Sequence, residues 1–448
     1  MIKRNIDTYL ESFYNTENKA LLITGARQIG KTFSIRQFGR THFKHFAEIN
    51  FIEHPEARAV FETVNGHNDI LLRLSAYLND PLVKGETLIF LDEVQECPEI
   101  ITAIKFLVEE GSFRYILSGS LLGVDLKDIK SVPVGYMAIK EMFPIDFEEF
   151  VRAQGVRDDV INNLQMCWNT MTPVDDMIHR KMMELFRLYL IVGGMPAAVQ
   201  TYIDTNNLQR VMEQQQHILT LYRKDIAKYD YANKLYIQEI FDLIPPELNN
   251  PNKRFILKHL NENLKFARYE NSFLWLKDAG VALPVYNVEE PTSPLLLARS
   301  RNLFKLFQND IGLLSCQYAN GIQLRIITGD DIINYGSIYE NVVAQELKAH
   351  GFTLYYFNSK KQGELDFLIE RGNSVIPIEV KSGKNYERHH ALTTVMQNRN
   401  YRIDEAYVLC NENISQKARV LYVPIYMTMF LRQNQMAPIS YKIDLTGL

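Results

Sequence analysis

The sequence predicts an α/β protein, and three features indicate this class. An apolar run at 20–23 precedes a glycine-containing loop and then a helical stretch. A second apolar run, at 87–91, ends in two acidic residues. Near the C-terminus, a helical segment at 338–347 is followed by short runs that read as strands. Short apolar runs bounded by loops and helices are typical of buried strands in helix-covered sheets.

The loop at 25–32 reads GARQIGKT and contains the complete G-x-x-x-x-G-K-[ST] phosphate-binding motif. Its glycines allow close wrapping around phosphates, and its N–H groups and the following helix N-terminus attract anions. Lys31 is expected to reach the β- and γ-phosphates, and Thr32 to bind Mg²⁺. A chance glycine-rich turn is the alternative, which the flanking strand and helix disfavour. The residues expected at the nucleotide are Gly25, Ala26, Arg27, Gln28, Ile29, Gly30, Lys31, Thr32 and Phe33.

The run at 87–91 ends in Asp92 and Glu93, which is the Walker B pattern. An acidic residue at the carboxyl end of a strand beside the phosphate loop can hold Mg²⁺ directly or through water. We therefore expect Asp92 in the metal site and Glu93 as the general base that polarises the attacking water. The runs at 45–51 and 114–118 predict two further strands of the same sheet.

Length and composition indicate a soluble protein of several domains. The chain has 448 residues, with 46% hydrophobic and 23% charged residues and a net charge of −4. This charge disfavours a wholesale nucleic-acid coat and leaves room for a local basic patch. The four cysteines are far apart, without disulfide-scaffold or metal-ligand spacing. With no visible signal peptide or membrane-spanning run, we expect a cytoplasmic protein without a membrane partner.

The middle of the chain is expected to be mostly helical, at 140–235, with a sharp break at 193–196. The prolines and asparagines at 245–251 predict a linker or turn. Helices at 253–260 and 270–279, followed by a strand at 281–286, give a winged-helix pattern. The second helix carries one cation, so a structural or protein-contact role is favoured over DNA reading. Arg299, Arg301 and Lys305 downstream are interpreted as a solvated basic face.

The last informative stretch is 335–384. Strands are expected at 354–357, 363–369 and 376–381. Asp366 and Glu379 alternate with apolar neighbours, so adjacent strands can present both carboxylates on one face. Lys381 lies two residues after Glu379 and points to the same side. Carboxylates in this arrangement suit Mg²⁺ and phosphodiester chemistry.

The phrases TGARQIGKT, LIFLDEVQECP, YILSGS, FPIDFEEF and YLIVGGMP together resemble a large bacterial and archaeal family of AAA-type P-loop ATPases that carry a C-terminal domain of unknown function. The resemblance implies ATP and Mg²⁺ as cofactors. It also implies a water-orienting sensor at the end of the 114–118 strand, for which Ser118 and Ser120 are the candidates; a serine-capped strand end is the alternative. Relatives commonly carry a Gly-Arg pair where this chain has Gly135-Tyr136.

The C-terminal spacing resembles the PD-(D/E)xK nuclease superfamily. The resemblance implies that Asp366 and Glu379 hold Mg²⁺, that Glu340 on the preceding helix completes the metal site, and that Lys381 activates water or stabilises the transition state. A decayed nuclease scaffold used for contact and a set of buried salt links are the alternatives. The implied domains are an AAA-type core at 1–139, a helical lid at 140–235, a winged-helix-like segment at 236–295 and a nuclease-like α/β domain at 296–448.

Three functions remain open on the sequence. The first is an ATP-hydrolysing switch, carried by Lys31, Thr32, Asp92 and Glu93, whose nucleotide state regulates the C-terminal domain. The second is an ATP-regulated, Mg²⁺-dependent DNA nuclease with Asp366, Glu379 and Lys381 as its catalytic residues. The third is a non-enzymatic, nucleotide-gated binding or regulatory module. The expected partners are ATP, DNA through the C-terminal domain, and a protein.

Overall fold

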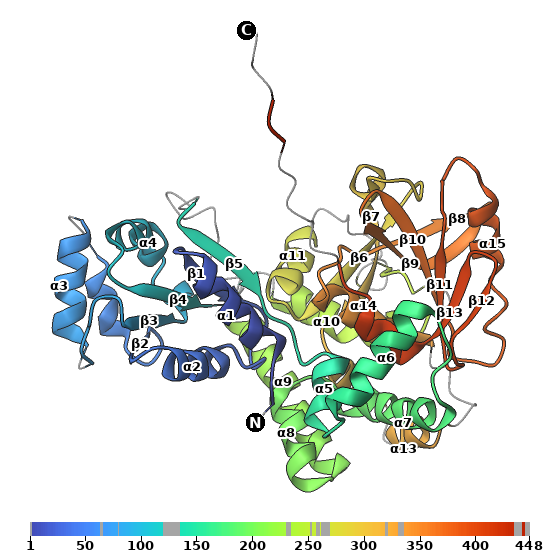
Figure 1. Cartoon of the computed structure of the whole chain (residues 1–448), viewed down its shortest axis with the longest axis horizontal. Coiled ribbons are helices and arrows are strands. Elements are labelled where there is room, and N and C mark those ends of the chain that lie inside the picture. The colour runs from blue at the N-terminus through green and yellow to red at the C-terminus, as the bar shows by residue number, and fades with distance from the viewer. Residues whose placement is uncertain are drawn as a thin grey trace.

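The computed structural model of the chain has two sheets at opposite ends and a layer of helices alongside them (Figure 1). It describes residues 2–62, 66–78, 80–119, 135–229, 234–250, 253–256, 260, 269–318, 321–329, 336–433 and 441–443. Within these residues, no helix is both long and apolar enough to cross a membrane.

The N-terminal sheet is parallel, with the strand order β2-β3-β4-β1-β5. Its strands are β1 (Ala20–Thr24), β2 (His45–Asn50), β3 (Thr87–Asp92), β4 (Arg114–Ser118) and β5 (Met137–Glu141). The first four confirm the predicted strands. The sequence did not predict β5, which pairs with β1 and is partly exposed along its length. The expected domain boundary at 139/140 is therefore wrong, because it cuts this strand.

Helices cover both faces of the N-terminal sheet. They are α1 (Asn5–Thr16), α2 (Lys31–His42), α3 (His67–Tyr77) and α4 (Glu99–Glu110). Alternate residues of β1 enter different cores, as the two-residue period of a strand requires. Leu21 and Ile23 pack in the core that contains α1 and α2, whereas Ala20 and Leu22 pack in the core that contains α3 and α4.

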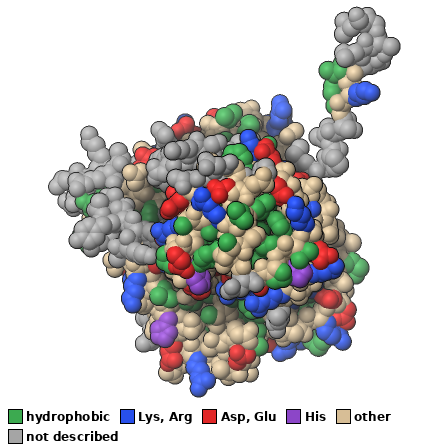
Figure 2. All heavy atoms as spheres, turned by 90° about the vertical axis from the view of Figure 1, so that its left-hand side faces the viewer, with side chains coloured by type: hydrophobic (Ala, Val, Ile, Leu, Met, Phe, Trp, Pro, Cys, Tyr) green, Lys and Arg blue, Asp and Glu red, His purple; other side chains and the backbone are tan. Residues whose placement is uncertain are grey.

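On the end of the molecule seen in Figure 2, basic and acidic side chains are interspersed.

The middle of the chain is helical, as predicted. It contains α5 (Phe147–Ala153), α6 (Asp158–Thr170), α7 (Asp176–Val192), α8 (Pro196–Thr205), α9 (Leu208–Tyr229) and α10 (Lys234–Leu248). The linker expected at 245–251 is wrong in its first half, because Pro245 and Pro246 lie inside α10. Ile244 and Leu248 are fully buried, and their packing outweighs the cost of the two prolines in the last turn.

The C-terminal sheet is mixed and has the order β12-β13-β11-β10-β9-β8-β6-β7. Its strands are β6 (Ala282–Val288), β7 (Arg299–Gln308), β8 (Tyr355–Ser359), β9 (Gly363–Arg371), β10 (Ser374–Val380), β11 (Ala406–Cys410), β12 (Ser415–Lys417) and β13 (Val420–Pro424). The remaining helices are α11 (Glu270–Asp278), α12 (Ile311–Cys316), α13 (Ile322–Thr328), α14 (Gly336–Ala349) and α15 (His390–Gln397), with short 3-10 turns at Pro55–Val60, Val94–Glu96, Leu295–Ala298 and Ile425–Phe430.

This sheet corrects the expected winged-helix segment. The second helix and the strand exist, as α11 and β6, but residues 253–256 are not helical. Residues 257–259 of the first expected helix lie outside the described residues. Because β6 pairs with both β7 and β8, the boundary expected at 295/296 falls inside the C-terminal sheet.

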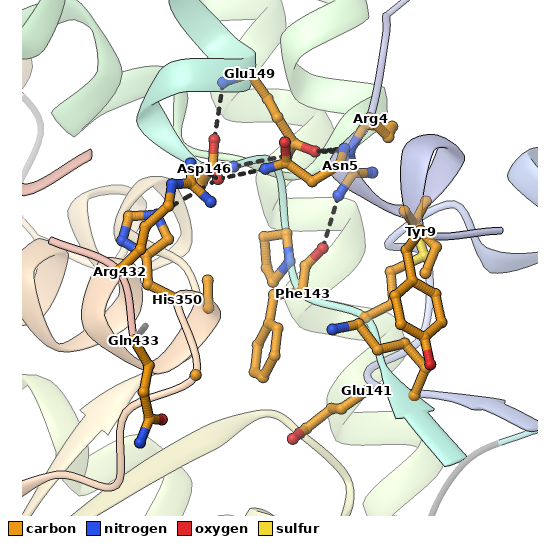
Figure 3. A pocket seen from close by; sticks show the side chains of 16 residues that line it. Arg4, Asn5, Tyr9, Glu141, Phe143, Asp146, Glu149, His350, Arg432 and Gln433 are labelled. Carbon is orange, nitrogen blue, oxygen red and sulfur yellow. Dashed lines mark hydrogen bonds and ion pairs between the residues drawn. The ribbon is translucent and has the colours of Figure 1, made fainter. Parts of the chain in front are cut away.

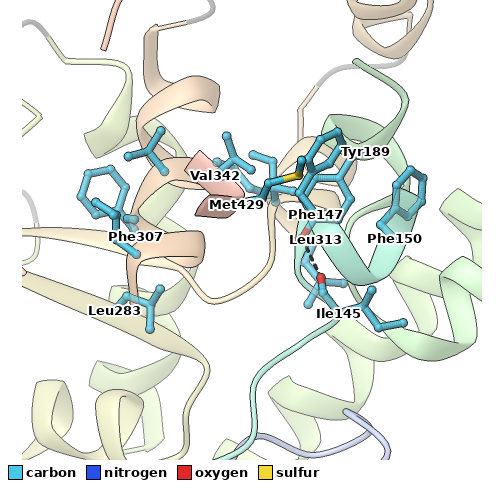
Figure 4. Packing of buried hydrophobic residues seen from close by; sticks show 14 of the residues in the cluster. Ile145, Phe147, Phe150, Tyr189, Leu283, Phe307, Leu313, Val342 and Met429 are labelled. Atoms are coloured by element: carbon cyan, nitrogen blue, oxygen red, sulfur yellow. Dashed lines mark hydrogen bonds between the residues drawn. The ribbon is translucent and has the colours of Figure 1, made fainter. Parts of the chain in front are cut away.

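A single apolar core joins the two ends of the molecule. Figure 4 shows side chains of α5, β6, β7 and α14 in one cluster, including Phe147, Leu283, Phe307 and Val342. Helix α14 confirms the helical segment predicted at 338–347, and it is buried from Ser337 to Leu347 because it lies between the C-terminal sheet and the helical layer. A second cluster covers the other face of the C-terminal sheet, beneath α15.

Candidate nucleotide site and C-terminal acidic cluster

The phosphate-binding loop connects β1 to α2. Gly25 has φ +131°, and a Cβ atom there would lie 2.2 Å from the carbonyl oxygen of Met142. Gly30 has φ +95° and directly precedes α2. Both conformations favour glycine. The glycine spacing of the motif is thus required by the backbone path of this loop.

Lys31 lies in the first turn of α2, and its side chain folds back over the phosphate-binding loop. Its ammonium donates to the carbonyl oxygens of Gly25, at 2.9 Å, and Ala26, at 2.8 Å. Burial lowers the pKa of Lys31 to about 8, although the charges of Glu93 and Asp92 oppose this shift. A phosphate group near the loop would offer this ammonium a stronger, charge-assisted acceptor than the two carbonyls.

Asp92 is the centre of a group of polar side chains at the carboxyl ends of the strands. Its Oδ2 accepts hydrogen bonds from Thr32 Oγ1 and Asn50 Nδ2, both at 3.1 Å, and its Oδ1 accepts one from Ser118 Oγ. Burial raises the pKa of Asp92, and the hydrogen bond from Ser118 partly offsets this. The structure therefore brings together Thr32, Asp92 and Ser118, which the sequence places in three separate elements.

Thr32 and Asp92 fit a magnesium ion. Both offer hard oxygen donors, and these lie within hydrogen-bonding distance of each other at the mouth of the phosphate loop. Mg²⁺ keeps several waters and usually takes only one or two protein ligands in phosphate sites. Two oxygens in this position therefore satisfy its requirements when a nucleotide supplies the rest.

Glu93 has a strained backbone, with φ +58° and ψ +48°. This left-handed conformation costs roughly 1 kcal/mol or more in a residue with a side chain. The Glu93 carboxylate accepts a hydrogen bond from Gln95 Nε2. Gln95 was not predicted, although it lies two residues away in the same motif. Such strain is often retained where a side chain has to be aimed at a reacting group.

Phe33 and Ser120 complete the residues predicted at the nucleotide. The Phe33 side chain is 58% exposed on the first turn of α2 and packs in no core. Ser120 lies outside the described residues, so Ser118 is the described sensor candidate. Tyr136, at the position of the relatives' arginine, donates to Glu109 at 2.6 Å through its hydroxyl group.

Elements from outside the N-terminal sheet touch the phosphate loop. Arg27 forms an ion pair with Asp225 of α9 at 2.5 Å, and the Tyr222 hydroxyl donates to the Arg27 carbonyl oxygen at 3.2 Å. The turn between α11 and β6 approaches so closely that a Cβ atom on Gly280 would lie 3.0 Å from the Ala26 nitrogen. The loop thus contacts both the helical layer and the C-terminal sheet.

The FPIDFEEF phrase carries a cluster of ion pairs that joins α1 to the C-terminal part of the chain. We call this cluster, formed by Arg4, Asp146, Glu149, His350 and Arg432, the charged latch. Asp146 caps α5 by accepting from the Glu149 amide at 2.8 Å, and Glu149 pairs with Arg4 at 3.1 Å. His350 and Arg432 each lie 3.5 Å from Asp146 (Figure 3). Burial opposes ionisation of Asp146, but His350 and Arg432 lower its pKa to about 2. These side chains line a cavity of about 300 Å³.

The two glycines of the YLIVGGMP phrase lie against Asp310, the residue that precedes α12. The Gly194 amide donates to Asp310 Oδ2 at 2.6 Å, and a Cβ atom on Gly193 would lie 2.4 Å from Asp310 Oδ1. Asp310 also caps α12 by accepting from the Leu313 amide at 2.9 Å. Burial raises the pKa of Asp310 to about 6. The two glycines therefore make room for a buried carboxyl group.

The predicted C-terminal residues lie around one face of the sheet. Asp366 on β9 accepts from the Val380 amide at 2.8 Å, and Glu379 on β10 pairs with Lys381 at 2.8 Å. Burial, followed by the charge of Asp366, raises the pKa of Glu379 to about 8, with a smaller contribution from Glu340. Asp366, Glu379 and Lys381 are thus neighbours, as the strand pattern predicts.

Glu340 departs from the expected metal site. Its carboxylate contacts the ammonium groups of Lys253 and Lys305, the latter at 3.3 Å. Among the described residues, no three His, Cys, Asp or Glu side chains form a metal-ligand set. That Glu340, Asp366 and Glu379 together hold Mg²⁺ stays a prediction, and in this structure two lysines contact the Glu340 carboxylate.

Lys305 was also misinterpreted, because it is fully buried rather than part of a solvated face. Its ammonium lies 2.7 Å from Glu364 Oε1. Neither Lys305 nor Glu364 was predicted as a site residue. The alternation of Glu364 with Asp366 on one strand is a signal that places both on the same face.

Three protein families match separate parts of the chain. Residues 17–151 match the AAA domain family, residues 183–323 match Domain of unknown function (DUF8612), and residues 335–427 match Domain of unknown function (DUF4143). An uncharacterized protein of Methanocaldococcus jannaschii is 23% identical over 363 residues, which cover 79% of this chain and 72% of that protein.

Two further similarities were found. A UPF0102 protein of Vibrio cholerae is 32% identical over 87 residues, which cover 18% of this chain and 71% of that protein. The structure of the Walker-type ATPase of Pyrococcus abyssi has a TM-score of 0.43 at 12% identity, covering 71% of this chain and 96% of that one. Residues 17–151 thus match the AAA domain family, and the chain belongs to the UPF0102 family through an 87-residue stretch.

Proposed function

We propose that this chain is a Mg²⁺-dependent ATPase whose nucleotide state is transmitted to its C-terminal α/β module. The observation that carries the proposal is the meeting of Thr32 and Asp92 at 3.1 Å beside Lys31, within a loop that also contacts α9 and the α11–β6 turn. These contacts support the proposal, because one part of the molecule would both hold the nucleotide and pass its presence to α9 and the α11–β6 turn.

Each residue of the nucleotide site has a role in this proposal. The loop amides and Lys31 bind the phosphates, and Thr32 and Asp92 would hold Mg²⁺, which neutralises charge on the β- and γ-phosphate oxygens when bound. Glu93 accepts a proton from the attacking water, whose oxygen bonds to the γ-phosphorus while the bond to the β–γ bridging oxygen breaks. Gln95 holds the Glu93 carboxylate in place, and Ser118 orients Asp92.

The experiment that tests hydrolysis is ATP turnover by the purified full chain. Lys31→Ala is expected to abolish turnover through loss of phosphate binding. Glu93→Gln is expected to lower kcat by about a hundredfold or more while ATP still binds, because only the proton acceptor is lost. Tight ATP binding with negligible turnover in the wild-type chain would favour a non-enzymatic, nucleotide-gated module. Turnover that is unchanged in both variants would contradict the proposal.

We further propose that the C-terminal module has a PD-(D/E)xK-like architecture with a binding role. Support comes from the order of its elements, which is α14, β8, β9, β10, α15 and β11, and from Asp366 and Glu379 on neighbouring strands. The contacts of Glu340 with two lysines disfavour a three-carboxylate cutting site. ATP turnover measured with and without duplex, branched and single-stranded DNA, and with RNA, tests which partner the module recognises.

Cutting is tested separately with the same nucleic acids in the presence of Mg²⁺. The binding role predicts no cleavage by the wild-type chain. Mg²⁺-dependent cleavage that is lost in Asp366→Ala would contradict it and would establish the module as a nuclease. Cleavage that persists in this variant would identify a contaminant.

A further inference from the structure

Lys305 is a buried cation at the centre of the C-terminal acidic cluster. It lies on β7 and is 0% exposed. Its ammonium contacts Glu364 on β9 at 2.7 Å and Glu340 on α14 at 3.3 Å, and it lies 5.1 Å from the centroid of the Tyr356 ring. A buried ammonium is retained only where several acceptors compensate for its lost hydration. The cluster therefore provides a site for one positive charge, and a side chain of the protein fills it.

The carboxylates around Lys305 have further partners. Glu340 also contacts Lys253, and Glu364 accepts from Asn358 Nδ2. Asp366 accepts from the backbone of β10, and Glu379 pairs with Lys381. In the part of the chain that the structure describes, three ammonium groups thus face four carboxylates. Divalent cations need several oxygen ligands whose charge is not already compensated.

The protonation of Lys305 follows from the same contacts. Burial alone would favour the neutral amine, but the charges of Glu340, Glu364 and Asp366 outweigh it and raise the pKa of Lys305.

We propose that Lys305 takes the place of a divalent metal ion in the C-terminal module, so that its acidic cluster is held together without a metal. The inference rests on the proposed nuclease-like architecture of this module and is independent of ATP turnover. It makes the cluster a structural centre, in which Glu340 and Glu364 position α14 against the sheet through the ammonium.

The test is Mn²⁺ binding to the full chain without nucleotide, measured by the loss of the free Mn²⁺ signal in electron paramagnetic resonance. All proteins carry Asp92→Asn, which removes the metal ligand of the nucleotide site. We expect no saturable binding in the millimolar range with Lys305 present. Lys305→Met keeps the aliphatic volume, removes the charge and is expected to gain one saturable Mn²⁺ site. Lys361→Met, which removes an exposed lysine of the same module, is the matched control and is expected to gain none.

Thermal unfolding gives a second readout. Mn²⁺ is expected to raise the Tm of Lys305→Met and to leave the Tm of the parent unchanged, because the metal restores the missing charge. Saturable binding by the parent that is lost in Asp366→Asn would overturn the inference, and so would a folded Lys305→Met chain that gains no site. If Lys305→Met does not fold, the same measurements are made on Lys305→Arg. This variant keeps the positive charge, so we expect it to fold and to bind no Mn²⁺. ATP turnover in the Asp92-containing chain is a separate measurement, so failure here leaves the ATPase proposal standing.

Discussion

Arg27 Nη1 in the phosphate-binding loop and Asp225 Oδ1 in α9 lie 2.5 Å apart. This ion pair joins two segments separated by 198 residues in the chain. A nucleotide that rearranges the loop must therefore move or break a contact with the helical layer. The pair is partly exposed, so its contribution to stability is small, on the order of 1 kcal/mol or less. Its importance lies in connecting the nucleotide to α9.

We predict that Asp225→Asn weakens this connection without abolishing ATP binding. In the wild-type chain, ATP is expected to change hydrogen–deuterium exchange in α9, and in Asp225→Asn this change is expected to shrink. Asp242→Asn is the matched control, because Asp242 of α10 pairs with Arg223 of α9 and not with Arg27 of the loop. Equal ATP-induced changes in both variants would show that the Arg27 contact transmits nothing.

The backbone of Gly25 provides a sharper perturbation. Gly25→Ala is expected to abolish ATP binding and lower the Tm, because the added Cβ atom would lie 2.2 Å from the Met142 carbonyl oxygen in a left-handed conformation. Gly85→Ala is the control. Gly85 also has positive φ, at +75°, but an added Cβ atom would meet nothing within 4 Å. This control is expected to cost about 1 kcal/mol and to leave ATP binding unchanged. Normal ATP affinity in Gly25→Ala would contradict the loop geometry.

Asp310 gives the protein a pH dependence that can be isolated by mutation. Its carboxyl group has an ordinary pKa near 3.8, which burial raises to about 6 in the folded chain. The folded state thus binds the proton more tightly than the unfolded state, and wild-type stability falls as the pH rises from about 4 to above 6. The loss is up to about 3 kcal/mol.

Asp310→Asn cannot titrate, so the Tm advantage of the wild-type chain over this variant should shrink as the pH rises through that window. Differential scanning calorimetry from pH 4 to 7.5 measures the difference. A Tm difference that stays constant across this range would show that Asp310 does not carry the raised pKa.

The charged latch predicts a large effect of Asp146→Asn at pH 7. This substitution weakens the cap of α5 and removes one of the two carboxylates that each of His350 and Arg432 contacts, for a cost of about 3 kcal/mol. Because the pKa of Asp146 is lowered, its contribution is present above about pH 4 and is lost as the pH falls toward 2. Asp175→Asn is the matched control: it removes the charge of the exposed α7 cap but keeps an oxygen that accepts the same hydrogen bonds, so it is expected to cost only about 0.5 kcal/mol. Similar Tm losses in both variants would contradict the latch.

The nucleotide site was predictable because its parts are local motifs on parallel strands. The glycine spacing identified the loop, and the acidic strand end identified Asp92. The rule that parallel strand ends share an edge brought Thr32 and Asp92 together across 60 residues. By contrast, β5 was missed because its sequence MAIKE is short and ends in two charged residues, and Ile139 on it is 52% exposed. Its pairing with β1 is a tertiary effect.

Long-range polar contacts could not be predicted from the sequence. The GGMP and FPIDFEEF phrases were read as a break and a family signature, whereas Asp310 and His350, which explain them, come from distant segments. Lys305 was misread because neighbouring basic residues in a sequence usually face water. Only the fold shows that Glu340 and Glu364 enclose it.

The central claim, that the nucleotide state reaches the C-terminal module through the phosphate loop, is tested most directly by hydrogen–deuterium exchange of α11 and β6. The protein is Glu93→Gln, which is expected to hold ATP without turning it over, compared with and without ATP and Mg²⁺. The account predicts a nucleotide-dependent change in the exchange of these two elements, because Gly280 lies against Ala26. It also predicts that ATP and Mg²⁺ leave the exchange of α11 and β6 unchanged in Lys31→Ala, because this variant is expected to lose phosphate binding. Unchanged exchange of α11 and β6 in Glu93→Gln saturated with ATP would contradict it.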